Sequence, residues 1–228
     1  MDDDSPPPGA PTEMVLPLVV RVERADPPGR TDALEAAAIA VLTMVSTDRP
    51  DWQEAVAEWD AYRIRKVVRR ARGAEWRRAL DLDGITVTRG TAEVRVYPPI
   101  PLDAWPRDLA RLQVSGTELI DESPPPAPTG GAPLILLSPH VTMTAGKAMA
   151  QAGHAAQLGW RTLGPAERAD WQQRGFELAV REATSDQWQE ARATSAPVVH
   201  DAGFTEVSPN SATALIVLAG RGQTASPA

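Results

Sequence analysis

The most informative stretch of this sequence reads MTAGKAMAQAGHA at residues 143–155, directly after a predicted strand. Thr144 is a favourable helix N-cap, which places Gly146 and Lys147 in the first turn of a predicted helix. A cation in the first turn opposes the helix dipole, so Lys147 is poorly placed for stability. Free backbone N–H groups beside an ammonium attract an anion, and this stretch therefore predicts an anion-binding helix start.

Three polar side chains follow one face of this helix. Lys147, Gln151 and His154 are spaced i, i+4 and i+7 on a helix otherwise rich in alanine and methionine. For His154 alone, a solvated or hydrogen-bonded side chain is the commoner explanation, but the triplet favours a functional face. The stretch is not a P-loop, because Val141 stands where its first glycine would be and Ala148 follows the lysine.

Composition excludes several classes of protein. The chain has 228 residues, a formal charge of -7 and no cysteine, which rules out disulfide scaffolds, thiolate metal sites and thiol nucleophiles. Its three histidines show no metal-ligand spacing, so neither a metal nor another cofactor is expected. No apolar run approaches the ~18–20 residues of a membrane helix, and the acidic, proline-rich start is unlike a signal peptide. We therefore expect a cytoplasmic protein without membrane contact.

Lysine is rare in this chain. It occurs only at Lys66 and Lys147, and the other basic residues are arginines. A lysine in such a background raises the question of whether its more readily neutralised ammonium is needed there.

The chain divides into five parts by composition. Residues 1–12 form a disordered tail, residues 122–131 a Pro/Gly linker and residues 221–228 a second loose tail. Between them lie an N-terminal α+β domain at 13–121 and a second domain at 132–220. The second domain reads as strand 133–137, helices 144–163 and 165–174, strand 176–181, a helix over 185–194 capped by Ser185, and strands 197–200 and 213–218. This order predicts a three-layer α/β/α domain with a mixed four-stranded sheet.

The N-terminal domain resembles a degenerate copy of the second. It reads as strand 16–22, helix 31–46, a long helical stretch over 52–79, a hairpin of 85–88 with 92–96, and a short helix over 102–112. Residues 17–20 resemble 133–136, and 93–109 resemble 177–191. In that alignment Thr31 and Glu35 replace Lys147 and Gln151, so the copy would be inactive.

Two separated motifs resemble the peptidyl-tRNA hydrolase 2 family of archaea and eukaryotes. That family has M-x-x-G-K-x-x-A-Q-x-x-H-A, matched at 143–155, then D-A-G-x-T, matched at 201–205, and a downstream threonine, Thr213. The resemblance implies hydrolysis of the ester between a peptide and the 3′ ribose of tRNA. It implies active-site roles for Lys147, Asp201, Thr205 and Thr213, and substrate binding by Gly146, Gln151 and His154. The sequence departs from the family at 138–141 and at Phe204, where many members have charged residues.

These residue types suit water-mediated ester hydrolysis. An ammonium such as Lys147 stabilises a tetrahedral oxyanion, and hydroxyls such as Thr205 and Thr213 orient water. An unperturbed aspartate, with a pKa near ~3.9, is a weak base, so burial must raise the pKa of Asp201 or His154 must help. We favour direct attack by water over a covalent intermediate, because the sequence has no G-x-S-x-G elbow and no cysteine.

A basic stretch at residues 63–72 is the candidate tRNA-binding element. On a helix, its apolar residues would share one face and its six cations the opposite arc. The cations are Arg63, Arg65, Lys66, Arg69, Arg70 and Arg72. They predict binding of the tRNA phosphate backbone, whereas the alternative is an ordinary solvated helix.

Two further functions stay open. A domain of the same fold that has lost turnover would bind tRNA without cleaving it, and a hydrolase for another acyl ester or amide would act without tRNA. Because the resembled family often dimerises, the chain is expected to form a homodimer or an intrachain pseudo-dimer.

Overall fold

The computed structural model describes residues 13–194, 196–203 and 207–218. Its N-terminal half contains β1 (Met14–Arg21), α1 (Arg30–Val45), α2 (Pro50–Ala61), β2 (Lys66–Ala71), α3 (Gly73–Asp81), β3 (Ile85–Arg89), β4 (Ala92–Val96), β5 (Ile100–Pro101) and α4 (Arg107–Ala110). Its C-terminal half contains β6 (Leu134–Leu137), α5 (Ala145–Thr162), α6 (Pro165–Gln173), β7 (Ala179–Glu182), α7 (Ser185–Ala193), β8 (Val198–His200) and β9 (Ala212–Val217).

The two halves have the same sheet topology. The C-terminal sheet has the order β7-β6-β9-β8, with β6 parallel to β7 and antiparallel to β9. The N-terminal sheet has the order β2-β1-β4-β3 with matching directions, and β5 pairs antiparallel with the first residues of β1. The mixed four-stranded C-terminal sheet is as predicted, and the N-terminal half repeats its fold.

Alternation along β6 builds the three layers of the C-terminal half. Ile135 and Leu137 belong to the cluster of buried residues that includes α5, whereas Leu136 packs with Trp188 and Ala191 of α7 on the other face. Successive side chains of a strand point to opposite faces, so an apolar run such as Leu134–Leu137 requires cover on both.

Paired tryptophans show which elements of the two halves correspond. The Nε1 groups of Trp59 in α2 and Trp171 in α6 each donate 2.9 Å hydrogen bonds to a carbonyl six residues later. Trp76 of α3 and Trp188 of α7 each pack on the outer face of their sheet. The segment that matches β7 and α7 is therefore β2 with α3, and the expected match of 93–109 with 177–191 is wrong.

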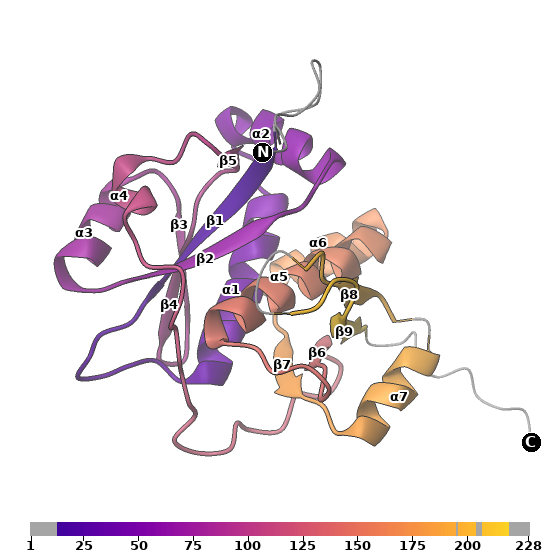
Figure 1. Cartoon of the computed structure of the whole chain (residues 1–228). Coiled ribbons are helices and arrows are strands. Elements are labelled where there is room, and N and C mark those ends of the chain that lie inside the picture. Colours follow the sequence, from indigo (N-terminus) through magenta and orange to yellow (C-terminus); the bar gives the residue numbers. More distant parts are fainter. Residues whose placement is uncertain (1–12, 195, 204–206, 219–228) are drawn as a thin grey trace, which may run out of the picture.

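Helices α1 and α5 join the halves into one core. They pack against each other between the two sheets (Figure 1), and a single cluster of buried side chains runs through both halves. Both helices are rich in alanine at buried positions. At Gly153 a Cβ would lie 2.8 Å from Cγ2 of Val41, so this glycine allows the close approach.

The basic stretch at 63–72 does not form the predicted helix. Helix α2 ends at Ala61, and β2 lies parallel to β1 with Val68 opposite Leu18. The β-branched pair Val67-Val68 favours a strand, and a strand sends neighbouring cations to opposite faces, which relieves the repulsion that a helix would impose.

Two smaller expectations also need correction. The helix expected over 102–112 is restricted to α4, which begins directly after Pro106. The N-cap of α7 is Thr184 rather than Ser185, because the Thr184 hydroxyl accepts a hydrogen bond from the N–H of Gln187.

Candidate functional site

Two groups from different parts of the chain accept hydrogen bonds from the first turn of helix α5. Thr144 caps the helix as predicted, since its hydroxyl accepts the N–H of Lys147 at 3.3 Å. The N–H of Ala145 donates to the carbonyl of Thr117, which belongs to the segment that joins the two halves. Thr117 is fully buried, and its Oγ1 has no hydrogen-bond partner among the described residues. No pattern in the sequence predicts this contact.

The side chains of Lys147 and Asp201 meet at this helix start. Nζ of Lys147 donates to Oδ2 of Asp201, a residue 54 positions later that follows β8. Both side chains are nearly buried, with 13% and 7% of their surface exposed. The ammonium of the helix start and the carboxylate of the distant loop therefore share one small volume.

Asp201 is held by donors on both carboxylate oxygens. Oδ2 also accepts the side-chain amide of Gln151 at 2.8 Å, and Oδ1 accepts the N–H of Gly203 at 2.8 Å. Gly203 has φ +80°, and a Cβ there would overlap Pro209, so only glycine suits this turn. These bonds fix the orientation of the carboxylate.

Thr213 completes the network from the neighbouring strand. It is fully buried on β9 and donates at 2.7 Å to the side-chain oxygen of Gln151. The amide of Gln151 in turn reaches Asp201, so the hydroxyl orients the amide and the amide orients the carboxylate. Such connected groups in a nearly dry site are rigid and strongly coupled.

Among the residues that the structure describes, the other residues predicted for the site are not hydrogen-bonded into this network. Gly146 is buried in the first turn of α5, beside Thr117. His154 contacts Lys66 of the N-terminal half rather than Asp201. Thr205 lies outside the described residues.

Residues 134–223 match the model of the peptidyl-tRNA hydrolase family PTH2. The C-terminal half is a PTH2 domain. No curated protein matches the chain significantly. Lys147, Gln151, Asp201 and Thr213 lie within the matched range, whereas Thr117 and Lys66 lie outside the PTH2 domain.

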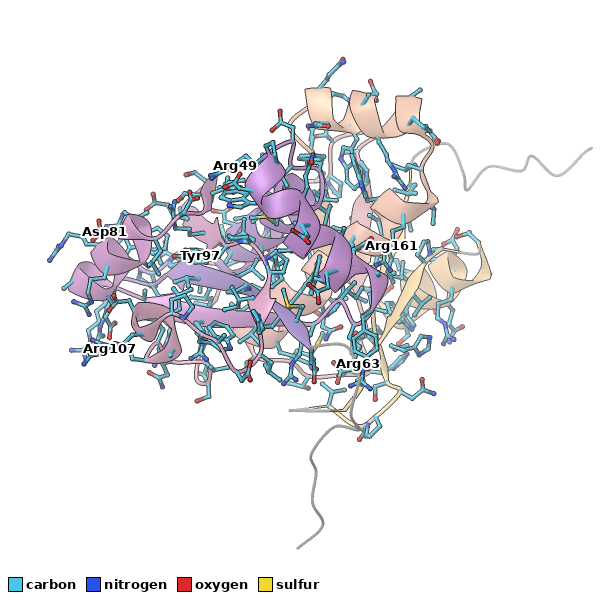
Figure 2. The ribbon with its side chains drawn as sticks, turned by 90° about the horizontal axis from the view of Figure 1, so that it is seen from above. Arg49, Arg63, Asp81, Tyr97, Arg107 and Arg161 are labelled. Carbon is cyan, nitrogen blue, oxygen red and sulfur yellow. The ribbon has the colours of Figure 1, made fainter. Side chains whose placement is uncertain are left out.

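The basic stretch offers fewer free cations than expected. Lys66 is buried, Arg65 pairs with Glu13, and Arg70 donates to the side chain of Gln113. Arg69 donates to two backbone carbonyls and lies over the ring of Trp105. The two exposed residues of the six are Arg63 and Arg72. Figure 2 shows Arg63 on the side of the N-terminal half that faces the PTH2 domain, with Arg107 on the far side.

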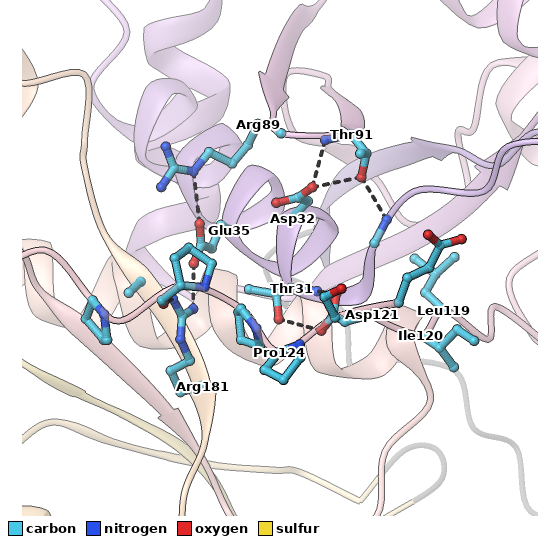
Figure 3. Close-up of a pocket in the computed structure, with 18 of the residues that line it drawn as sticks. Thr31, Asp32, Glu35, Arg89, Thr91, Leu119, Ile120, Asp121, Pro124 and Arg181 are labelled. Carbon is cyan, nitrogen blue, oxygen red and sulfur yellow. Dashed lines mark hydrogen bonds and ion pairs between the residues drawn. The ribbon is translucent and has the colours of Figure 1, made fainter.

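A cavity of about 770 Å³ lies at the part of the N-terminal half that corresponds to the Lys147 network of the PTH2 domain (Figure 3). The segment that links the halves, together with Glu177 and Arg181 of the C-terminal half, also lines it. It lies at the start of α1 and the turn between β3 and β4. The third residue of α1 is Asp32, whereas Lys147 is the third residue of α5, and Asp32 accepts two hydrogen bonds from Thr91 of that turn. The expected counterpart, Thr31, is therefore off by one position.

Carboxylates dominate the lining of this cavity. They are Asp26, Asp32, Glu35, Glu118, Asp121, Glu122 and Glu177, against the guanidiniums of Arg89 and Arg181. Only a short turn at Gly90-Thr91 joins β3 to β4, whereas residues 201–211 separate β8 from β9. The N-terminal copy thus lacks both the lysine and the loop that supplies Asp201, and its charge repels phosphate.

Within the described ranges, no group of three or more histidine, aspartate or glutamate side chains is arranged to hold a metal ion. In that same part of the chain, none of the helices has both the length and the apolar character to cross a bilayer.

Proposed function

We propose that this protein is a cytoplasmic peptidyl-tRNA hydrolase that cleaves the ester between a peptide, or an N-blocked amino acid, and the 3′ ribose of tRNA. The observation that carries the proposal is the contact of Lys147 with Asp201 inside a PTH2 domain. A lysine ammonium and a carboxylate beside a helix start provide the charges that ester hydrolysis requires.

In this mechanism Lys147 stabilises the oxyanion that forms when water adds to the ester carbonyl. Asp201 orients the attacking water, and Gln151 with Thr213 holds the carboxylate in place. The water gives one proton to Asp201 as it adds, and collapse of the tetrahedral intermediate breaks the bond to the 3′ oxygen. The 3′ oxygen takes this proton from Asp201 and leaves as free tRNA, and the peptide is released with a new C-terminal carboxyl group. Thr205 is proposed to orient water from the same loop.

For tRNA binding, we propose the exposed cations Arg63 and Arg72 in place of the whole basic stretch. Phosphate contacts make binding depend on salt. Arg63→Ala is therefore expected to weaken tRNA binding at low salt and to reduce its salt dependence.

The decisive experiment is release of the peptide from peptidyl-tRNA by the purified protein. Lys147→Ala is expected to lower kcat at least 100-fold, as for removal of one oxyanion donor. Arg192→Ala removes an exposed cation from α7 of the same domain and is the matched control. Equal rates for Lys147→Ala and the wild type would exclude this mechanism.

The second candidate is a tRNA-binding domain without turnover. It is favoured by the near-complete burial of the Lys147–Asp201 pair, because a substrate has to separate these two side chains before it can contact them. Binding of peptidyl-tRNA without release of the peptide would support it. Cleavage of simple acyl esters or amides without tRNA would support the third function, a hydrolase of another class.

A further inference from the structure

The site at the start of α5 has little net charge of its own, because the carboxylate of Asp201 neutralises the ammonium of Lys147. The arginines among the described residues of the PTH2 domain either pair with carboxylates or lie away from this helix start. The paired ones are Arg161, Arg174 and Arg181. The others are Arg168, which donates to carbonyls at the opposite end of α5, and Arg192, which belongs to α7 on the other face of the sheet. A free positive charge for an anionic substrate is therefore to be sought in the N-terminal half.

Arg70, the last residue but one of β2, occupies the position that matches Glu182 of β7. The paired tryptophans described above differ by a constant offset in residue number, and the same offset relates Arg70 to Glu182. The carboxylate of Glu182 pairs at 3.0 Å with Arg30, the first residue of α1. Because α5 packs against β2 as α1 packs against β7, this relation directs Arg70 to the start of α5.

The segment that joins the halves connects Arg70 to this helix start. The N–H of Arg70 donates to the carbonyl of Gln113 at 2.9 Å, and its Nη2 lies 4.0 Å from where a Cβ of Gly116 would be. The carbonyl of the next residue, Thr117, accepts the N–H of Ala145 at 3.0 Å. The guanidinium therefore lies beside the residue that precedes the contact with α5.

The direction of β2 gives the same position. Lys66 and Val68 both face the core between the helices, and alternate residues of a strand share a face, so Arg70 faces it too. Lys66 lies against Gly153, eight residues after the start of α5. Eight helical residues rise about 12 Å and four strand residues about 13 Å, so Arg70 and Ala145 are level.

Arg70 keeps its positive charge available to a ligand. Its Nη2 donates at 2.6 Å to the side-chain oxygen of Gln113, a neutral amide that orients the guanidinium without neutralising it. Among the described residues, no carboxylate pairs with Arg70. A planar guanidinium held in this way suits the bidentate binding of a phosphate.

We infer that Arg70 completes the hydrolase site from the other half of the chain by binding the phosphate nearest the ester. This phosphate is attached to the 5′ oxygen of the same ribose whose 3′ oxygen carries the peptide. The N-terminal half, which lacks a lysine at the start of α1, thereby supplies a substrate-binding residue to the PTH2 domain. This role rests on the proposed function and adds to it a subsite formed by both halves.

The test uses two small substrates of the full-length protein. One is adenosine 5′-phosphate esterified at its 3′ oxygen with an N-blocked amino acid, and the other is the same ester without the phosphate. Arg70→Gln is expected to raise KM about tenfold for the phosphorylated ester, as for loss of a charged hydrogen bond, and to leave KM for the other ester and both kcat values unchanged. Arg77→Gln, which removes an exposed cation from α3, is the control. An unchanged KM for the phosphorylated ester, or an equal rise for both esters, would overturn the inference.

A second variant changes the charge without removing the arginine. Gln113→Glu puts a carboxylate of nearly the same shape in place of the amide, so it neutralises the guanidinium of Arg70. We expect KM for the phosphorylated ester to rise at least as much as in Arg70→Gln, again with no change for the other ester. A wild-type KM for Gln113→Glu would contradict the inference.

Binding separates this inference from the proposed function. Amide analogues of the two esters, with nitrogen in place of the 3′ oxygen, report the same difference as Kd values without turnover. If the wild type releases no peptide from peptidyl-tRNA, the proposed function fails, and these Kd values alone decide whether Arg70 binds the phosphate. Absence of binding of the phosphorylated analogue to the wild type would overturn the inference.

Discussion

At the residue scale, the Lys147–Asp201 contact joins two positions that only the fold brings together. Sequence motifs nominated both residues through a family resemblance, and Gln151 and Thr213 with them. The partners of Asp201 could not be read from spacing, because they come from α5 and from the loop's own Gly203, and Thr213 of β9 acts on Asp201 only through Gln151. Lys66 is predicted to bind tRNA but is buried, and the rarity of lysine in this chain is the sequence signal that sets it apart from the arginines around it.

Asp201→Asn tests the carboxylate itself. The amide retains an oxygen for one donor, but its NH₂ group opposes the donors of Lys147 and Gln151. We expect kcat to fall by about 100-fold or more, since charge-assisted bonds to the carboxylate are lost. Asp186→Asn, an exposed change on α7, serves as the control in the same peptide-release assay. A rate within threefold of the wild type would remove Asp201 from the mechanism.

The lowered pKa of Lys66 predicts how stability depends on pH. Its pKa is lowered in the folded protein and ordinary in the unfolded chain, so between these values the unfolded chain binds more protons. Stability therefore rises with pH, by up to about 1.4 kcal/mol per unit, and Lys66→Met abolishes this contribution. Urea unfolding of both proteins from pH 7 to 9 measures the difference.

Other charges do not disturb this comparison. Asp60 of α2 and Arg161 and Lys147 of α5 are the same in both proteins and cancel in the difference. His154 contributes in a lower window, because its lowered pKa costs stability only as pH falls below about 6.5. Parallel curves for the wild type and Lys66→Met would show that folding does not lower the pKa of Lys66.

At the element scale, most helices and strands follow from periodicity, but β2 does not. The stretch around β2 has apolar spacing that fits a helix, yet it forms the parallel neighbour of β1. Pairing with β1, as β7 pairs with β6, outweighs the local pattern. Sequence alone does not show that the N-terminal half needs this strand, because the similarity between the halves pairs residues 93–109, rather than β2, with the segment that contains β7.

The crossing of α1 and α5 predicts a steric effect at Gly153. Gly153→Ala places a methyl group against Val41, and overpacking of about 1–3 kcal/mol exceeds the gain of about 1 kcal/mol in helix propensity. The two terms leave a net loss of roughly 0–2 kcal/mol, and we expect a loss near the middle of this range, about 1 kcal/mol, in urea unfolding. Val41→Ala in the same chain should relieve the clash, so the double variant loses less than the sum.

Gly130→Ala provides the control for this prediction, since a Cβ there meets nothing within 4 Å. It is expected to leave the unfolding midpoint unchanged. If Gly153→Ala also leaves it unchanged, the helices are less closely packed than the structure shows.

At the scale of the whole molecule, a buried carboxylate ties the two halves together. Glu35 of α1 is 3% exposed and accepts hydrogen bonds from Arg181 of β7 and Arg89 of β3. It also accepts the N–H of Val180 at 3.3 Å. Because these donors come from both sheets, Glu35 fixes the position of one half against the other.

Glu35→Gln tests this connection. Removing one partner of a buried ion pair costs about 3–5 kcal/mol, and we expect the lower end because the Arg89 side chain is 46% exposed. Thermal and urea unfolding measure the loss, with the exposed Glu58→Gln on α2 as the control. A loss below about 1 kcal/mol would mean that Glu35 contributes little to holding the two halves together.

The packing of α1 on α5 has a consequence for how the protein behaves in dilute solution. Two separate polypeptides held through such a surface come apart when their concentration falls below the dissociation constant. Here the covalent link between the two halves keeps α1 at a high effective concentration near α5, whatever the concentration of the protein in solution. Specific activity should therefore stay constant from micromolar to picomolar enzyme.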